Sequence, residues 1–423
     1  MKVIYNITPD EYENLLRRPS SDNEDIDERV REIIELVEKG GDNSLRKLCL
    51  EIDGKLPEQF EIPRETLLNA SADIDDLLKS SIQKAVKNIE SFHRAQKPED
   101  KTVETMPGVS CTIRYRAIDN VGLYIPGGTA PLLSTVLMTA IPAQIAGCKN
   151  IIACTPPGAP PELLYTLGLF NIRVFAIGGA QAIAAMALGT ESIPAVDKIF
   201  GPGNQWVTKA KMQLAGRGLA IDMPAGPSEV MVIADSSAVP AYVASDLLSQ
   251  AEHGPDSQVI LLADSKELIE ECLRETELQL ADLPRREWAT RSLENGLAIC
   301  VRDIDQAIEI SNIYGPEHLI LSVRDADDAE KGVTNAGSVF LGNNTPESAG
   351  DYASGTNHTL PTGGAARAWS GITTASFMKS ITVQKVTREG LMQLAPVILQ
   401  MARAEQLEAH AGAVLQRLKE SGT

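Results

Sequence analysis

The chain has 423 residues, of which 43% are hydrophobic and 23% charged, a composition typical of globular proteins with two or three domains. Its formal net charge of −18 disfavours nucleic acids and anionic membranes as partners, because both require a basic face. No apolar run approaches the roughly 18 residues of a membrane helix, and the start turns polar too early for a signal peptide.

The N-terminal hundred residues predict helices, because apolar residues recur at spacings of three and four, as in "DIDERVREIIELVEKG". From about Arg116, short apolar strands such as "NIIACTPPG" and "EVMVIAD" alternate with helices such as "APLLSTVLMTAIPAQIAG". This alternation predicts parallel βαβ units, enough for two sheets. After about Gly371 the pattern predicts helices again. This amphipathic tail should pack on the body of the protein or, as we favour, on a second subunit.

Three glycine-rich turns follow predicted strands: "YIPGG" (124–128), "IGGAQA" (177–182) and "GPGN" (201–204). A turn from a strand into a helix can hold a pyrophosphate, because the helix N-terminus presents free N–H groups and a partial positive charge. None of the three reads GxGxxG, the usual dinucleotide fingerprint. They are interpreted either as tight turns between βα elements or as parts of a nucleotide site.

Polar residues gather in the second half of the chain. Gln250 and His253 share one face of a helix, so both could reach one cation, or they are a helix-end histidine with a hydrogen-bonded amide. Glu317 and His318 adjoin where a turn enters a strand, and this pair suits a general base beside a carboxylate that orients water. The alternative is a surface acid beside a core histidine. His93 has no predicted role.

A long loop, "PESAGDYASGTNHTLPTGG", carries Glu347, Asp351 and His358, and the last histidine, His410, follows Glu405 in the C-terminal helix. The six cysteines are dispersed, form no CxxC pair and lie in apolar contexts. They are interpreted as reduced, buried thiols of a cytoplasmic protein.

Seven motifs in one order, spread over nearly the whole chain, resemble the L-histidinol dehydrogenase family. They are "VGLYIPGGTAPLLSTVLMTAIPA", "GGAQAIAA", "VDKIFGPGN", "IDMPAGPSEVMVIAD", "SDLLSQAEHGPDSQ", "YGPEHLI" and "PESAGDYASGTNHTLPT". The resemblance implies oxidation of L-histidinol to L-histidine through bound histidinal, the last steps of histidine biosynthesis, with two NAD⁺ and one water. It also implies a homodimer with one Zn²⁺ per subunit.

The site residues follow from the same resemblance. Zinc ligands would be Gln250, His253 and Asp351, with His410 donated by the other subunit. His318 would be the general base of both oxidations, and Glu317 would activate water for the second. Substrate would contact these ligands and His318, and also Ser228, His358 and Glu405. NAD⁺ would contact Tyr124, Gln181 and Asn204, one residue in each glycine turn.

The implied fold is α/β, with two Rossmann-like domains that have parallel sheets and lack GxGxxG, and with small helical extensions at both ends. The expected ranges are residues 1–22 for the N-terminal extension, 23–123 with 230–372 for the domain with zinc and catalytic residues, 124–229 for the NAD-binding domain, and 373–423 for an arm docked on the partner subunit. Residues 363–371, "GGAARAWSG", depart from the family pattern and bear on substrate range.

Three other functions compete with this prediction. The first is a paralogue of the same fold that oxidises a different amino or hydroxy alcohol. The second is a cysteine-dependent aldehyde dehydrogenase, which requires an exposed, activated thiol. The third is a non-catalytic nucleotide-binding scaffold, in which Glu317 and His318 only pack.

Overall fold

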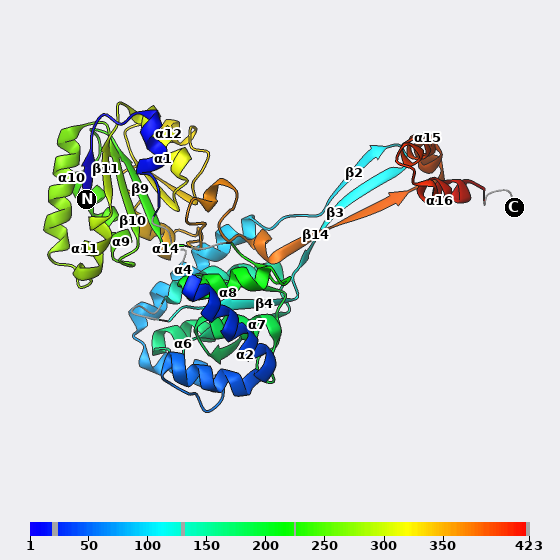
Figure 1. Ribbon diagram of the computed structural model, residues 1–423, viewed down its shortest axis with the longest axis horizontal. Coiled ribbons are helices and arrows are strands. Elements are labelled where there is room, and N and C mark those ends of the chain that lie inside the picture. Colours follow the sequence, from blue (N-terminus) through cyan, green and yellow to red (C-terminus); the bar gives the residue numbers. More distant parts are fainter. Residues whose placement is uncertain (19–23, 128–131, 224–225, 420–423) are drawn as a thin grey trace. The chain divides into compact units, whose positions relative to one another are not determined.

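The computed structural model describes residues 1–18, 24–127, 132–223 and 226–419. Its contacts divide the chain into a large unit, residues 1–96 and 118–377, and a small unit, residues 97–117 and 378–423 (Figure 1). The large unit confirms the predicted α/β class with parallel sheets. The domain boundaries remain a prediction, and residues 19–22 fall outside the described ranges. Among the described residues, no helix has both the length and the apolar character needed to cross a membrane.

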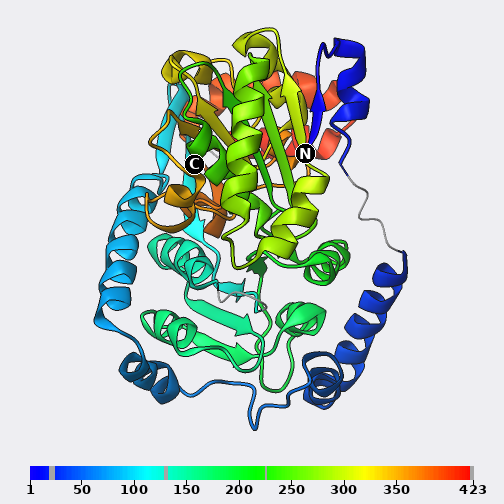
Figure 2. The ribbon, with the colours of Figure 1, turned by 90° about the vertical axis from the view of Figure 1, so that its left-hand side faces the viewer.

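Sheet A of the large unit has six parallel strands with helices on both faces (Figure 2). In spatial order its strands are β1 (Lys2–Ile4), β11 (Leu297–Cys300), β10 (Gln258–Ala263), β9 (Glu229–Ala234), β12 (His318–Ser322) and β13 (Ser338–Leu341). Its helices are α9 (Pro240–Ala251), α10 (Lys266–Leu280), α11 (Arg286–Glu294), α12 (Ile304–Tyr314), α13 (Ala326–Glu330) and α14 (Glu347–Tyr352). Strand β9 is buried throughout: Val230 and Val232 pack with α9 and α10, whereas Met231 and Ile233 pack with α12.

Sheet B of the large unit has five parallel strands. In spatial order they are β6 (Arg173–Ala176), β5 (Asn150–Thr155), β4 (Asn120–Tyr124), β7 (Lys198–Phe200) and β8 (Ala220–Ile221). The helices of this half are α2 (Glu24–Leu48), α3 (Arg64–Asn69), α4 (Asp76–Ala95), α5 (Leu133–Ala146), α6 (Pro161–Gly168), α7 (Gly179–Leu188) and α8 (Gln205–Ala215), with a π-helical turn η2 (Cys49–Asp53) after α2. Helix α2 packs against α7 and α8 and shares their apolar core.

Both sheets have the strand order of the Rossmann fold. Numbered along the chain from β9 in sheet A and from β4 in sheet B, the strands lie in the order 3-2-1-4-5, with β1 added at one edge of sheet A. Each sheet therefore has a point where the strand order reverses, between β9 and β12 in sheet A and between β4 and β7 in sheet B. Such switch points are where open parallel sheets bind ligands.

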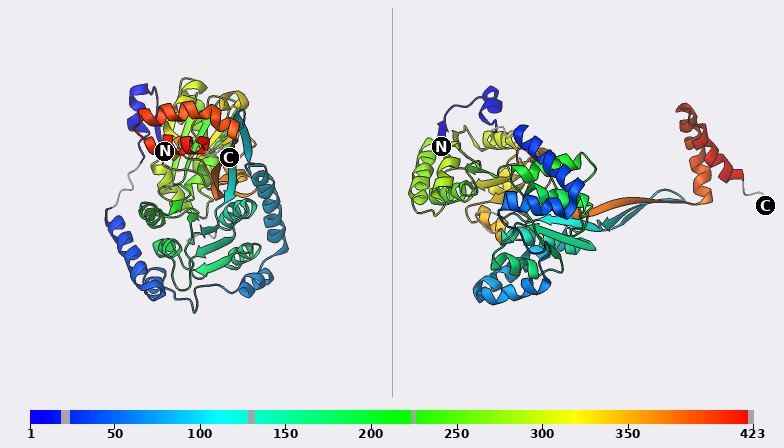
Figure 3. Two further views of the ribbon diagram at one scale, coloured as in Figure 1. Left: turned by 90° about the vertical axis from the view of Figure 1, so that its right-hand side faces the viewer. Right: turned by 60° about the horizontal axis from the view of Figure 1, so that its bottom comes forward.

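The two chain extensions contain strands as well as helices. The N-terminal segment begins with β1, which pairs with β11, and continues into η1 (Pro9–Glu11) and α1 (Tyr12–Leu15). The small unit joins β2 (Lys101–Met106), β3 (Val109–Ala117) and β14 (Met378–Val386) in an antiparallel sheet, followed by α15 (Arg388–Ala404) and α16 (Glu408–Lys419) (Figure 3). The helix predicted after Gly371 is therefore wrong for β14, whose β-branched residues Ile381, Thr382 and Val383 favour a strand.

Candidate active site

A pocket of about 300 Å³, the main pocket, is lined by residues at the carboxyl ends of β4 and β7 and at the amino ends of β9 and β12. The main pocket thus lies at the switch point of sheet B, where open parallel sheets usually bind ligands, whereas sheet A contributes the opposite ends of its strands. Predicted site residues from both sheets line this pocket: Asn204, Ser228, His253, Glu317, His318, Asp351 and His358.

Glu317 and His318 are held by the backbone of a single residue, Glu229. Gly315 caps the end of helix α12 with a φ of 63° and directs the chain into β12, and His318 is the first residue of that strand. The N–H of Glu229 donates to Oε2 of Glu317 at 2.9 Å, and the Glu229 carbonyl oxygen lies 3.1 Å from Nδ1 of His318. Glu317 is therefore not a surface acid, because both residues of the predicted pair are 6% exposed or less and line the pocket.

Three carboxylates surround His318. Oε2 of Glu317 and Oε1 of Glu347 each lie 3.7 Å from Nδ1, and Oδ1 of Asp351 lies 3.7 Å from Nε2. Burial alone would lower the pKa of His318, but the carboxylates of Glu347, Glu317 and Asp351 raise it to about 10. Burial raises the pKa of both Glu317 and Glu347 to about 8. The site thus places three carboxyl groups around one imidazole, and a bound cation would favour the ionised form of these carboxyl groups.

Gln250 and His253 lie at the end of α9 and contact each other. The hydrogen bonds of the Gln250 amide are satisfied when Nε2 donates to Oε1 of Glu347 at 3.0 Å and Oε1 accepts from Nδ1 of His253 at 3.0 Å. In that arrangement Nδ1 of His253 carries the proton, so Nε2 keeps a free lone pair for a ligand. Gln250 itself is fully buried, behind the residues that line the pocket.

The donor atoms in this region suit a divalent cation. Single ligand atoms of His318, Glu347 and Asp351 lie within 4.8 Å of one another. In the part of the chain that the structure describes, the buried Nε2 atoms of His318 and His358 and Oε2 of Glu347 have no hydrogen-bond partner. Histidine nitrogen and carboxylate oxygen are donors that zinc accepts, so the residues present fit that metal.

Of the three residues predicted to contact NAD⁺, one lines the main pocket and two are buried outside its lining. Asn204 lines the main pocket and caps α8, accepting from the N–H groups of Trp206 and Val207. Tyr124 and Gln181 are buried, and the Tyr124 hydroxyl accepts from the N–H of Gly179 at 3.0 Å. Nε2 of Gln181 donates to Asp53 at 3.2 Å, and its buried Oε1 has no partner. Gly128 of the first glycine turn lies outside the described residues.

Two further predicted residues belong to the small unit. Glu405 follows the last turn of α15, and His410 lies in α16. Both are exposed.

Comparisons with known proteins identify the family. The family model of histidinol dehydrogenase matches residues 16–418. The histidinol dehydrogenase of Shigella sonnei strain Ss046 is 52% identical over 97% of this chain and 96% of its own length. That of Bacteroides thetaiotaomicron is 50% identical over 99% of each chain. A crystal structure of histidinol dehydrogenase from Elizabethkingia anophelis superposes with a TM-score of 0.97, at 48% identity over 100% of this chain and 99% of that chain.

The chain belongs to the histidinol dehydrogenase family. The family predicted from the sequence motifs is confirmed, and with it an oxidoreductase of histidine biosynthesis. Sequence identities of 50% and 52% to histidinol dehydrogenases, over nearly the full length, do not favour a paralogue with another substrate.

Three residues in or beside the site were given no role in the sequence analysis. His93, given no role, is fully buried in α4 and lies 3.3 Å from the Asn357 amide, directly before His358. Glu229 directly follows Ser228 in the motif "GPSE", so the motif that pointed to Ser228 could also have pointed to Glu229. Arg285 lines the main pocket but lies in a charged stretch without any motif.

The remaining switch point, in sheet A, faces a second pocket of about 330 Å³. Asp235 follows β9 and Asp325 follows β12, and both line this acidic pocket together with Asp305 and Asp328. The switch point of sheet A is therefore acidic, whereas the residues that sheet B and its turns contribute to the main pocket are uncharged.

Proposed function

We propose that this enzyme oxidises L-histidinol to L-histidine in two steps through bound histidinal, using two NAD⁺ and one water. The observation that carries the proposal is the backbone of Glu229, which holds Glu317 and His318 together at a pocket whose other wall contains Asn204. The carboxylate and the imidazole lie next to each other at the pocket where NAD⁺ is proposed to bind. Such a pair can remove a proton from the substrate while a hydride passes to the nicotinamide.

His318 is proposed to act as base in both steps. In the first, it accepts the hydroxyl proton as the carbinol hydride passes to NAD⁺, which gives the aldehyde. In the second, Glu317 accepts a proton from water as the water oxygen bonds to the aldehyde carbon. The proton that His318 took in the first step passes to the carbonyl oxygen, which gives the hydrate and returns His318 to its neutral form. His318 then accepts a hydrate proton as the second hydride leaves to a fresh NAD⁺, and the carboxylic acid forms.

The zinc is proposed to be held by His253, Asp351 and Gln250, with His410 of the partner subunit as a further ligand. When bound, zinc orients the imidazole and amino nitrogens of the substrate and offsets the negative charge near His318. The fit rests on the free Nε2 of His253 and on Asp351, both of which line the pocket. Ser228, His358 and Glu405 are proposed substrate contacts, and Tyr124, Gln181 and Asn204 are proposed contacts of NAD⁺.

A homodimer with a shared active site is proposed from the surface of the small unit. This unit exposes large apolar side chains that a second copy would cover. They are Ile381, Val383 and Val386 of β14, Met392, Val397 and Met401 of α15, and Leu407. Because His410 and Glu405 belong to this same unit, its exchange between subunits would deliver both residues to the partner's site. We also propose a cytoplasmic location, in keeping with six free cysteines.

A cysteine-dependent aldehyde dehydrogenase is the weaker alternative. All six cysteines lie in the described part of the chain, and none lines the main pocket. Burial raises the pKa of Cys49, Cys148 and Cys272 to about 12, so these thiols are not ionised near neutral pH.

The test measures NADH formed from L-histidinol by the purified enzyme, after chelation, and after zinc is restored. About two NADH per histidinol, lost on chelation and regained with zinc, are expected from the two-step proposal. One NADH per histidinol would contradict the second oxidation, and activity unchanged by complete zinc removal would contradict the metal.

A further inference from the structure

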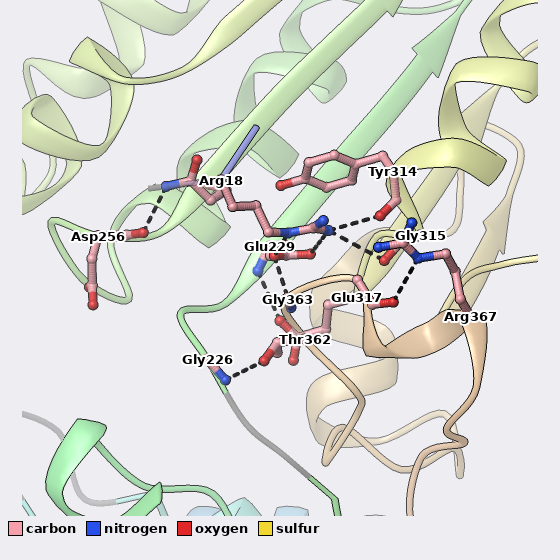
Figure 4. A network of polar contacts seen from close by, with 12 residues as sticks. Arg18, Gly226, Glu229, Asp256, Tyr314, Gly315, Glu317, Thr362, Gly363 and Arg367 are labelled. Atoms are coloured by element: carbon pink, nitrogen blue, oxygen red, sulfur yellow. Dashed lines mark hydrogen bonds and ion pairs between the residues drawn. The ribbon is translucent and has the colours of Figure 1, made fainter. Parts of the chain in front are cut away.

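Arg18, at the end of the N-terminal segment, reaches a residue 211 positions away in the sequence. Its Nε lies 2.5 Å from Oε1 of Glu229 and its Nη2 lies 2.8 Å from Oε2, a bidentate pair (Figure 4). The Glu229 side chain is 1% exposed. Such a buried carboxylate is strongly destabilising without a partner, and a planar guanidinium is the side chain that matches both of its oxygens.

Arg18 also holds the turn that precedes the catalytic pair. Its Nη2 donates to the carbonyl oxygen of Tyr314 at 3.0 Å, and its guanidinium lies 3.7 Å from the centroid of the Tyr314 ring. Tyr314 ends α12, three residues before Glu317. One guanidinium therefore joins the amino end of β9 to the turn that enters β12 (Figure 4).

Both elements that Arg18 joins position reacting groups. The backbone of Glu229 contacts Glu317 and His318 directly. The Glu229 carboxylate also accepts from the N–H of Gly363 at 3.0 Å, at the start of the stretch 363–371 that departs from the family pattern. A shift of Glu229 would thus move the base, the water-activating acid and this loop together.

We propose that Arg18 is a positioning residue for the dehydrogenase reaction: by clamping Glu229 to the turn before β12, it sets the placement of Glu317 and His318. The N-terminal segment is then a functional part of the active site and not only an added edge of sheet A. This inference rests on the proposed roles of Glu317 and His318. Among the described residues, Arg18 makes no hydrogen bond or ion pair with His253 or Asp351, so its removal should spare zinc.

The test compares Arg18→Ala with a matched control, Arg17→Ala, which removes the neighbouring, exposed arginine. For Arg18→Ala we expect kcat to fall by roughly tenfold to a hundredfold, the loss typical of catalytic groups displaced by about 1 Å. The KM for histidinol should stay within about twofold of wild type, and the zinc content should be unchanged. A folded Arg18→Ala enzyme with wild-type kcat would overturn the proposal.

Chemical rescue separates positioning from a general loss of structure. Ethylguanidinium should restore kcat of Arg18→Ala in a saturable manner, because it supplies the missing planar guanidinium group with its paired N–H donors. Ethylammonium lacks this group and should not restore kcat. A kcat loss that ethylguanidinium does not reverse, together with zinc loss or a large rise in KM, would assign Arg18 a structural role only.

If Arg18→Ala does not fold, Arg18→Lys decides, since it keeps the charge and loses the fork. We expect a folded enzyme whose kcat is several-fold lower, and wild-type kcat would overturn the proposal. Glu317→Gln and His318→Asn are measured in the same assay. If these two are silent, the proposed catalytic roles fail; if they lose activity while both Arg18 variants keep it, only the positioning role fails.

Discussion

Nδ1 of His318 lies 3.1 Å from the carbonyl oxygen of Glu229, and among the described residues Nε2 of His318 has no hydrogen-bond partner. In the neutral ring, a proton on Nδ1 donated to this carbonyl leaves the lone pair on Nε2. We therefore propose that Nε2 accepts the substrate proton once bound zinc offsets the carboxylates that raise the pKa of His318. His318→Asn should slow the oxidation of both histidinol and histidinal by roughly 10² to 10⁴-fold, measured as NADH formed from each substrate. Slowing of only one of the two steps would contradict a shared base.

Glu317→Gln should separate the two steps. Water activation belongs only to the second oxidation, so histidinal oxidation should fall by about 10²-fold or more while the first hydride transfer from histidinol is much less affected. Single-turnover NADH formation from each substrate measures this difference. Glu309→Gln, an exposed glutamate on α12, is the control and should leave both rates unchanged. Equal slowing of both steps would rule out the proposed role.

Zinc binding is tested at His253, whose Nε2 is free for a ligand. His253→Ala should lower the zinc bound per subunit at limiting zinc and reduce histidinol oxidation in parallel. Metal analysis of the dialysed protein checks this expectation, with Asp256→Ala, an exposed acid nearby, as the control. Full zinc content in the His253 variant would remove this residue from the ligand set.

Sharing of the site between subunits can be tested with two inactive variants. Heterodimers of His410→Ala and His253→Ala subunits would contain one intact site if His410 is donated across the dimer. Random mixing makes about half of the dimers heterodimeric, each with one of two sites intact, so about a quarter of wild-type activity is expected. Activity that stays at the level of the separate variants would argue that each site is built from one chain.

His93 should make the fold sensitive to acid. Burial lowers its pKa to about 4, from the ordinary value of 6.5. As the pH falls below 6.5 the unfolded chain gains this proton first, so stability is lost progressively until about pH 4. Between pH 7 and pH 5 the wild type should lose about 2 kcal/mol more unfolding free energy than His93→Gln, measured by urea titration. Parallel pH dependence of the two proteins would show that His93 titrates normally.

The sequence predicted the repeating part of the fold well. Alternating apolar strands and helices predicted two parallel sheets, because fully buried strands such as Glu229–Ala234 read as continuous apolar runs. It did not predict β14, which is exposed along most of its length and carries little apolar pattern. Strand β1 was also missed, since three residues at a sheet edge give too short a signal.

The site residues were predicted from sequence motifs, whereas the contacts between residues far apart in the chain were not predicted. Glu317 and His318 adjoin in the sequence, so their pairing was visible, whereas the hold of Glu229 on both depends on the pairing of β9 with β12. Arg18 and Glu229 lie 211 residues apart, and spacing carries no trace of that contact. His93 was given no role because it lies in a charged helical stretch, but it is fully buried in α4 next to Asn357.

The acidic pocket at the switch point of sheet A has a consequence for the order of events. Asp235, Asp305, Asp325 and Asp328 would repel the phosphates of a dinucleotide, although the strand order there is that of a dinucleotide-binding sheet. In the proposed reaction only the edge of sheet B would then accept NAD⁺, so the two dinucleotides consumed per histidinol would occupy the same place in succession. The spent NADH has to depart and an oxidised molecule arrive while the reactive aldehyde stays behind, which requires the substrate to be gripped independently of the nucleotide.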